Sequence, residues 1–203
     1  MSSIELFQNK TDCCGCSACY NVCPRKAISM QEDEYGYVYP VIDQDKCVGC
    51  GLCRKVCHYQ ADKELRTPIK AYAAAGKKEE FLKKAASGGM FSLVADKILE
   101  EGGVVFGAAM EYHNNTLIPK HIAVESKEEL FKLQGSKYVQ SFIGNTYAEA
   151  KKYLADGRKV LFSGTPCQIE GLKGYLGREY ENLYTIDIIC HGVPNAKWFQ
   201  DYI

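Results

Sequence analysis

Two cysteine runs of the same spacing constrain this chain more than any other feature. Each run reads Cys-x2-Cys-x2-Cys-x3-Cys, and together they hold eight of the eleven cysteines. The runs consist of Cys13, Cys16, Cys19 and Cys23, followed by Cys47, Cys50, Cys53 and Cys57. Thiolates at this spacing are typical of proteins that hold a pair of [4Fe–4S] clusters. Because such clusters move single electrons, the runs predict a redox protein with an N-terminal domain of the two-cluster ferredoxin type.

The spacing also predicts which cysteines share a cluster. Three thiolates of a run bind one cluster, whereas the fourth cysteine points away and is a ligand of the other cluster. Small residues between the ligands, such as Gly15 and Gly49, let backbone N–H groups approach the cluster sulfurs. We therefore expect one cluster at Cys13, Cys16, Cys19 and Cys57, and the other at Cys47, Cys50, Cys53 and Cys23.

Two other uses of cysteine fit the sequence less well. A structural zinc ion takes four ligands, usually as two Cys-x2-Cys pairs separated by a longer stretch. Two in-line runs of four, the first followed directly by Pro24, differ from that arrangement. Disulfides are disfavoured because the sequence has no signal peptide and cytosolic thiols stay reduced. We therefore expect a cytoplasmic protein whose cysteines hold iron–sulfur clusters.

Composition narrows the class of partner. The 203 residues include 25 basic and 25 acidic side chains, so the formal net charge is zero. This balance gives no reason to expect nucleic acid or an anionic membrane as a partner. No apolar stretch approaches the roughly 20 residues that span a bilayer. A redox protein and a small-molecule acceptor are the partners that we expect.

The chain divides into two parts near Thr67-Pro68. In residues 1–66, the segment 35–41 reads as a short extended or hairpin segment and 62–66 as a charged linker. In residues 67–203, strand patterns alternate with helix patterns, so we expect the α+β class: a dicluster ferredoxin domain followed by an α/β domain. The strands are expected at 71–75, 104–110, 117–124, 159–163 and 183–189, and the helices at 88–101, 126–133, 146–156 and 166–176.

Three glycine-containing turns lie beside these elements. They are Ser87-Gly88-Gly89, Gly135-Ser136-Lys137 and Gly164-Thr165. Each turn offers backbone N–H groups that could bind a phosphate, the first and third of them at a helix N-terminus. Lys137 could pair with the same phosphate. When each turn is taken alone, ordinary capping and turn chemistry is the more common explanation.

The order of these segments resembles the beta-subunit family of coenzyme F420 (deazaflavin) hydrogenases and dehydrogenases. The resemblance covers residues 71–192 and rests on five blocks, at 86–91, 103–108, 135–141, 164–168 and 187–194. It implies a flavoprotein-like second domain that binds FAD, and a redox partner such as a ferredoxin or a hydrogenase or dehydrogenase subunit. Family members continue well past the position of Ile203, so we expect this chain to be C-terminally truncated, with part of the flavin site missing.

The thiols outside the two runs are candidates for catalysis. Thr165 as N-cap, Pro166 and Gln168 predict that Cys167 lies in the first turn of a helix, where the helix dipole lowers a thiol pKa. Cys190 and His191 end an apolar strand, which is a common location for sites in α/β sheets. Packing is the alternative for each of these side chains. Cys14 is expected to be a spare thiol and His58 a neighbour of the cluster, not a ligand.

Three functions are consistent with these features. The first is an iron–sulfur flavoprotein that relays electrons through two [4Fe–4S] clusters to or from FAD and a further acceptor. The second is a ferredoxin-like electron carrier or docking module without flavin catalysis. The third is a dithiol oxidoreductase that uses Cys167 and Cys190.

Overall fold

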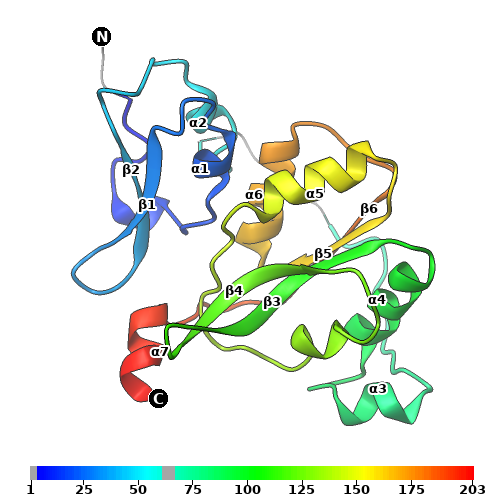
Figure 1. Ribbon diagram of the computed structural model, residues 1–203. Helices are drawn as coiled ribbons and strands as arrows, with labels where there is room; N and C mark the ends of the chain where they lie inside the picture. The colour runs from blue at the N-terminus through cyan, green and yellow to red at the C-terminus, as the bar shows by residue number, and fades with distance from the viewer. Residues whose placement is uncertain (1–3, 61–66) are drawn as a thin grey trace.

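The computed structural model describes residues 4–60 and 67–203, and it shows a small N-terminal unit beside a larger mixed α/β unit (Figure 1). The expected linker at 62–66, and with it the expected division after residue 66, lies outside the described residues. Among the described residues, every helix is too short or too polar to cross a membrane.

The N-terminal unit is an antiparallel hairpin with three short helical segments. Strands β1 (Ile28–Glu32) and β2 (Val38–Ile42) pair in register, with Ile28 opposite Ile42. The hairpin expected around 35–41 is therefore present, although its first residues form the turn rather than a strand. The helical segments are η1 (Lys10–Asp12), α1 (Ala18–Val22) and α2 (Leu52–Lys55). Each of the two α-helices starts inside a cysteine run, so the runs are folded as loop-and-helix turns.

The second unit is built on a four-stranded mixed sheet. Its strands are β3 (Val104–His113), β4 (Thr116–Val124), β5 (Val160–Gly164) and β6 (Leu183–Asp187), in the order β4-β3-β5-β6. The β3–β4 pair is antiparallel and is joined through Asn114 and Asn115, both at positive φ, as the sequence predicts. The β3–β5 and β5–β6 pairs are parallel. The C-terminal ends of β5 and β6 therefore meet at one edge of the sheet.

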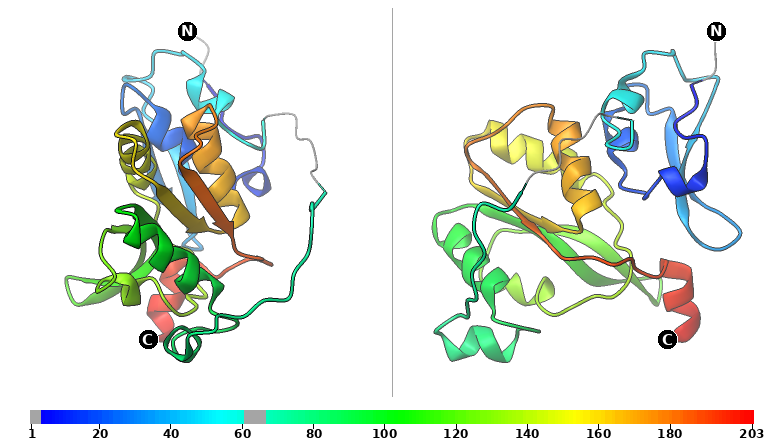
Figure 2. Two further views of the ribbon diagram at one scale, coloured as in Figure 1. Left: turned by 90° about the vertical axis from the view of Figure 1, so that its right-hand side faces the viewer. Right: turned by 180° about the vertical axis from the view of Figure 1, so that it is seen from behind.

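Helices cover both faces of this sheet (Figure 2). Because successive strand residues point to opposite faces, Val104 and Phe106 of β3 pack against α5 (Thr146–Ala155) and α6 (Pro166–Leu176). Val105 and Ala109 of β3 belong to the opposite core, with α4 (Met90–Glu100). All five residues of β5 are buried, as expected for a strand covered on both faces.

Two of the expected elements are absent or reduced. Residues 71–75 form no strand, because this exposed, alanine-rich segment has little β-propensity and pairs with no other strand. The helix expected at 126–133 is only the 3-10 turn η2 (Leu130–Lys132). A short helix that the pattern did not predict, α3 (Glu79–Lys83), precedes α4.

Two boundaries also differ from the expectation. Helix α4 begins after Gly89, which is the N-cap at φ +72°, and not after Ser87. A glycine at this left-handed position avoids the steric strain of a side chain. Strand β6 ends at Asp187, so Ile188 and Ile189 lie beyond it, exposed, and not inside a strand.

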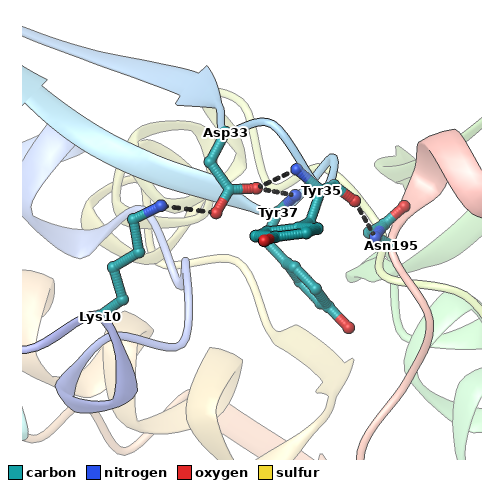
Figure 3. Close-up of polar contacts among 5 residues, drawn as sticks. All are labelled: Lys10, Asp33, Tyr35, Tyr37 and Asn195. Carbon is teal, nitrogen blue, oxygen red and sulfur yellow. Dashed lines mark hydrogen bonds and ion pairs between the residues drawn. The ribbon is translucent and has the colours of Figure 1, made fainter.

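The hairpin turn of the N-terminal unit contacts the C-terminal helix α7 (Ala196–Tyr202), as Figure 3 shows. Asp33 accepts hydrogen bonds from the backbone N–H groups of Tyr35 and Tyr37, and it forms an ion pair with Lys10 at 2.7 Å. The side-chain amide of Asn195, the N-cap of α7, donates to the carbonyl of Tyr35 at 2.8 Å. This contact joins two segments that are far apart in the sequence.

Candidate iron–sulfur centre

The eight cysteines of the two runs line two cavities in the N-terminal unit. The first cavity is lined by Cys13, Cys16, Cys19 and Cys57. The second is lined by Cys47, Cys50, Cys53 and Cys23. The last cysteine of each run therefore lies with the first three cysteines of the other run. This is the crossed grouping that the spacing predicts, and the assignment of these cysteines as cluster ligands stays a prediction.

The spacing of the sulfurs distinguishes a cluster from a single metal ion. A tetrahedral zinc ion with Zn–S bonds of ~2.3 Å needs sulfurs about 3.8 Å apart. Among the described residues, the one group of three donors within 4.8 Å of one another is Cys14, Cys16 and His58. Neither set of four cysteines is that compact. A [4Fe–4S] cluster holds its four thiolates farther apart because four irons and four sulfides lie between them, so the residues present fit a cluster.

Backbone N–H groups point at the sulfurs of the first cavity. The N–H groups of Gly15 and Ala18 donate to the thiols of Cys13 and Cys16, respectively, and favour their thiolate forms. Burial opposes this effect and raises the pKa of Cys13 to about 11. Gly15 has a φ of +66°, and a Cβ there would lie 2.8 Å from the Val38 carbonyl oxygen. The loop therefore depends on glycine for its close approach to the hairpin.

The second cavity has a similar donor and is the more exposed of the two. The N–H of Ala27 donates to the sulfur of Cys23 at 3.3 Å. Cys50 is exposed, and so are the neighbouring side chains of Val48 and Leu52. The second cavity therefore has an apolar, solvent-facing rim.

The first cavity, by contrast, lies against the second unit. The hydroxyl of Tyr147 in α5 interacts with the carbonyl oxygens of both Cys16 (3.0 Å) and Gln168 (2.7 Å). The side-chain amide of Gln140 donates to the carbonyl of Cys14 at 3.2 Å. At Gly171 of α6, an added Cβ would lie 3.1 Å from the Cys16 sulfur. The first cavity is thus the point of contact between the two units.

Cys167 also lies at this contact. The capping box that the sequence predicts is present: Thr165 is the N-cap of α6, and its N–H donates to the Gln168 side chain at 3.0 Å. The pKa of Cys167 is lowered to about 6, and the largest cause is a hydrogen bond from Cys14, ahead of the contact with Thr165. The sulfur of Cys167 lies 3.1 Å from the Thr165 hydroxyl. The direction of the shift agrees with the expectation, but its main cause is a thiol from the other unit.

Cys14, expected from the sequence to be a spare thiol, has several side-chain contacts in the structure. Its sulfur lies 3.8 Å from Nε2 of His58 and interacts with the sulfurs of Cys16 and Cys167. These hydrogen bonds raise the pKa of Cys14 while they lower the pKa of Cys16 to about 5. No sequence signal pointed to this arrangement, because Cys14 and Cys167 lie in different units.

Cys190 and His191 lie beyond the end of β6. The sulfur of Cys190 accepts a hydrogen bond from the N–H of Gly192 at 3.3 Å. Among the contacts of the described residues, none joins Cys190 to Cys167, so the structure does not bring this expected thiol pair together.

The first two candidate flavin-binding turns lie close to each other. Gln134, directly before Gly135-Ser136, donates to the hydroxyl of Ser92 in α4 at 3.0 Å, and Ser87-Gly88-Gly89 leads into the same helix. Lys137 donates to the carbonyl of Gln134 at 2.7 Å, and burial lowers the pKa of its amine.

Packing within the chain explains some of the glycines in these turns. A Cβ at Gly88 would clash with the carbonyl oxygen of Ala74, and one at Gly164 would lie 3.0 Å from the Gln168 side chain. At Gly135, by contrast, no atom lies within 4 Å of an added Cβ. Of these three glycines, only Gly135 leaves room for a ligand to approach. The turn at Gly164 and Thr165 contributes instead to the surroundings of Cys167.

A buried histidine that no sequence pattern singles out, His121, lies beneath the Gly164–Gln168 turn. Nε2 of His121 donates to the carbonyl of Ser163 at 3.0 Å, and its Nδ1 contacts the hydroxyl of Ser141 at 2.9 Å. The side chain of Gln168 donates to the same hydroxyl at 3.1 Å. Burial lowers the pKa of His121 to about 4. The lowered pKa keeps the imidazole neutral at neutral pH, and the hydrogen bonds of Ser141 with His121 and Gln168 hold the first turn of α6 in place.

Because His121 is buried in its neutral form, the folded chain is expected to lose stability in mild acid. Below pH 6.5 the unfolded chain binds a proton at His121, whereas the folded chain does not until about pH 4. We expect the free energy of unfolding to fall by about 2 kcal/mol between pH 6.5 and pH 5, and to stay constant between pH 7 and pH 8 as far as His121 is concerned. In urea unfolding, a His121→Gln variant should lack this part of the pH dependence. Equal slopes for both proteins would contradict the assignment.

Comparison with protein families matches almost the whole chain. Residues 12–61 match a 4Fe-4S dicluster domain. Residues 71–145 match the N-terminal model, and residues 157–203 the C-terminal model, of the coenzyme F420 hydrogenase/dehydrogenase beta subunit.

Curated relatives show the same resemblance at low identity. A coenzyme F420-dependent sulfite reductase of Methanocaldococcus jannaschii is 24% identical over 191 residues, which cover 90% of this chain and 28% of that protein. An uncharacterized protein of the same organism is 25% identical over 200 residues, with 84% and 54% coverage. The chain therefore spans about a quarter to a half of the length of these two relatives.

A solved structure, that of the F420-reducing [NiFe] hydrogenase complex from Methanosarcina barkeri, matches 68% of this chain and 51% of its own, with 22% identity. The TM-score of this match is 0.49. The two beta-subunit models together match more than half of the residues. The chain therefore belongs to the coenzyme F420 hydrogenase/dehydrogenase beta subunit family, with a 4Fe-4S dicluster domain at its N-terminal end.

Proposed function

We propose that this chain relays single electrons through two [4Fe–4S] clusters between a redox partner protein and a two-electron carrier. The observation that carries the proposal is the crossed grouping of the cysteines around two cavities, with sulfurs too widely spaced for a mononuclear metal. The ligands of the first cluster are Cys13, Cys16, Cys19 and Cys57, and those of the second are Cys47, Cys50, Cys53 and Cys23. Bound there, the clusters supply one-electron chemistry.

The position of each cavity gives the relay an order. The rim of the second cavity is exposed and apolar at Val48 and Leu52, which suits the docking of a partner protein. The first cavity contacts the second unit through Tyr147 and Gly171. Electrons therefore enter or leave at the second cavity and pass through the first toward the α/β unit. Backbone N–H groups at both cavities offset the negative charge of the thiolates.

The direct test is the chemical composition of the anaerobically purified chain. Two clusters require about eight irons and about eight acid-labile sulfides per chain, and the reduced protein should show two interacting paramagnetic centres. One zinc ion per site, without sulfide, would overturn the proposal.

We further propose that the α/β unit binds FAD as the two-electron carrier. The support is the grouping of the N-terminus of α4, the open Gly135 and the partly buried amine of Lys137, which together suit a phosphate. The related sulfite reductase is described as coenzyme F420-dependent, which makes a deazaflavin the first external acceptor to test.

If FAD binds at this site, replacing Lys137 should weaken FAD binding without affecting the clusters. Replacing Lys137 with methionine removes a cation, so we expect the affinity for added FAD to fall about tenfold, equivalent to ~1.4 kcal/mol, with unchanged iron content. Lys132→Met is the matched control, because Lys132 is a nearby lysine whose amine pairs with Glu129. Equal FAD affinity of both variants and the wild type, measured by fluorescence titration, would count against the site.

A ferredoxin-like carrier without flavin is the second candidate function. The close packing of Gly88 and Gly164 within the chain favours it, because neither glycine needs a ligand to explain it. The two candidates differ in one property: the carrier would contain iron and sulfide but would bind no FAD.

A further inference from the structure

Exposed basic side chains lie beside the second cavity. The two loops that form it, residues 24–27 and 43–55, carry five basic and two acidic side chains, a net charge of +3 in a chain whose formal net charge is zero. One pair cancels, because Lys46 forms an ion pair with Asp43 at 2.6 Å. Arg54 lines a neighbouring cavity that also contains two carboxylates. Three basic side chains of the two loops remain.

These three side chains lie at the second cavity. Arg25 lines it, and Lys26 follows directly in the chain. Lys55 lies three residues after Leu52, which also lines the cavity, and therefore on the same face of α2. All three basic residues are exposed, and among the ion pairs and hydrogen bonds of the described residues none involves their side chains. Asp45 is the one carboxylate of the two loops outside an ion pair.

The centre of this surface is apolar and open. Val48 is 56% exposed and Leu52 is 39% exposed. No atom lies within 4 Å of a Cβ placed at Gly49 or Gly51, so the loop is uncovered on its outer side. In Figures 1 and 2 this loop, which joins β2 to α2, lies at the end of the N-terminal unit remote from the four-stranded sheet. A partner can therefore reach it without displacing any described part of the chain.

We propose that this surface, called here the basic face and made of Arg25, Lys26, Val48, Leu52 and Lys55, docks an acidic electron-transfer protein. The inference rests on the proposed function, because it names the chemistry of the redox partner at the second cavity. Carboxylates of the partner would neutralise the three cations, and an apolar patch between them would cover the two aliphatic side chains. Complementary charge speeds and orients the encounter, and the apolar contact adds affinity. The apolar centre also favours a protein over a nucleic acid as the partner.

Binding of two probe proteins to the whole, cluster-containing chain tests the charge preference. The acidic probe is a plant-type ferredoxin and the basic probe is cytochrome c, and biolayer interferometry under anaerobic conditions measures both affinities. We expect the chain to bind the ferredoxin at least about tenfold more tightly than cytochrome c. The affinity for ferredoxin should fall about tenfold between about 0.05 M and about 0.5 M salt, because salt screens exposed charges.

A triple variant locates the effect on the basic face. R25Q/K26Q/K55Q should bind ferredoxin about tenfold more weakly than the wild type, and the single variants K26Q and K55Q about twofold more weakly. The matched control removes three exposed lysines of the α/β unit that also lack ion pairs among the described residues, as K70Q/K77Q/K152Q. Both triple variants change the net charge equally, so the control should keep the wild-type affinity within about twofold.

Iron and sulfide content, measured in every protein, separates this inference from the proposed function. With eight irons retained, equal ferredoxin affinity of the two triple variants would overturn the inference and leave the relay standing. So would a preference for cytochrome c, a preference for duplex DNA over ferredoxin, or no ferredoxin binding by the wild type. If R25Q/K26Q/K55Q loses iron, the single variants decide in the same way. Zinc in place of iron and sulfide in the wild type would overturn the proposed function and the inference together.

Discussion

Replacing Cys57 with serine is expected to remove the cluster that is held mainly by the first cysteine run, although Cys57 belongs to the second run. The reason is that Cys57 lines a cavity with Cys13, Cys16 and Cys19, whereas the rest of its own run lines the other cavity. Iron content should fall from about eight to about four per chain, because one of two four-iron clusters is lost. Iron and sulfide analysis of the anaerobically purified variant measures the effect.

Double variants show which cluster is lost. C13S combined with C57S should lose no more iron than either single variant, because both residues serve the same cluster. C23S combined with C57S should lose nearly all of the iron. Cys14→Ser is the control, since Cys14 lines the same cavity but is outside the proposed ligand set. If C13S and C57S had additive effects on iron content, the crossed assignment would be wrong.

Gly174→Ala is expected to weaken the contact between the two units. A Cβ at Gly174 in α6 would lie 2.5 Å from the backbone carbonyl oxygen of Val56, which cannot move aside as a side chain could. In an isolated helix, alanine would be better than glycine by roughly 1 kcal/mol. Overpacking costs typically ~1–3 kcal/mol, and contact with a backbone carbonyl that cannot move aside belongs to the upper part of this range, about 2–3 kcal/mol. After the helix gain is subtracted, we expect a net loss of about 1–2 kcal/mol in the free energy of unfolding.

Denaturant unfolding followed by intrinsic fluorescence measures this loss, together with the iron content. Gly107→Ala is the matched control, because Gly107 lies in β3 and an added Cβ there would have ordinary contacts of 3.5 Å or more with Leu133. Stability equal to the wild type for Gly174→Ala would mean that α6 does not pack on the N-terminal unit as the structure shows.

Features encoded by neighbouring residues could be predicted from the sequence. The Asn114-Asn115 turn, the capping box of α6 and the hairpin of the N-terminal unit are all present where short patterns placed them. Turn and cap preferences depend on a few adjacent backbone dihedral angles and hydrogen bonds, so local sequence is enough. The prediction of a strand at 71–75 was wrong because a strand needs a neighbouring strand to pair with, and local sequence does not show whether one is present.

The sequence alone determined the membership of the two cysteine groups, because the Cys-x2-Cys-x2-Cys-x3-Cys spacing directs the fourth thiol of each run away from the other three. It also determined that the chain is a two-part α+β protein of the beta-subunit family. Only the tertiary structure placed Cys14 beside Cys167 and buried His121 beneath the same turn. Those contacts join residues that are distant in sequence. The first arises from the packing of α6 on the cysteine-rich unit, and the second arises from packing inside the α/β unit. No local spacing encodes such packing, because it depends on the complementary shapes of surfaces built from distant segments of the chain.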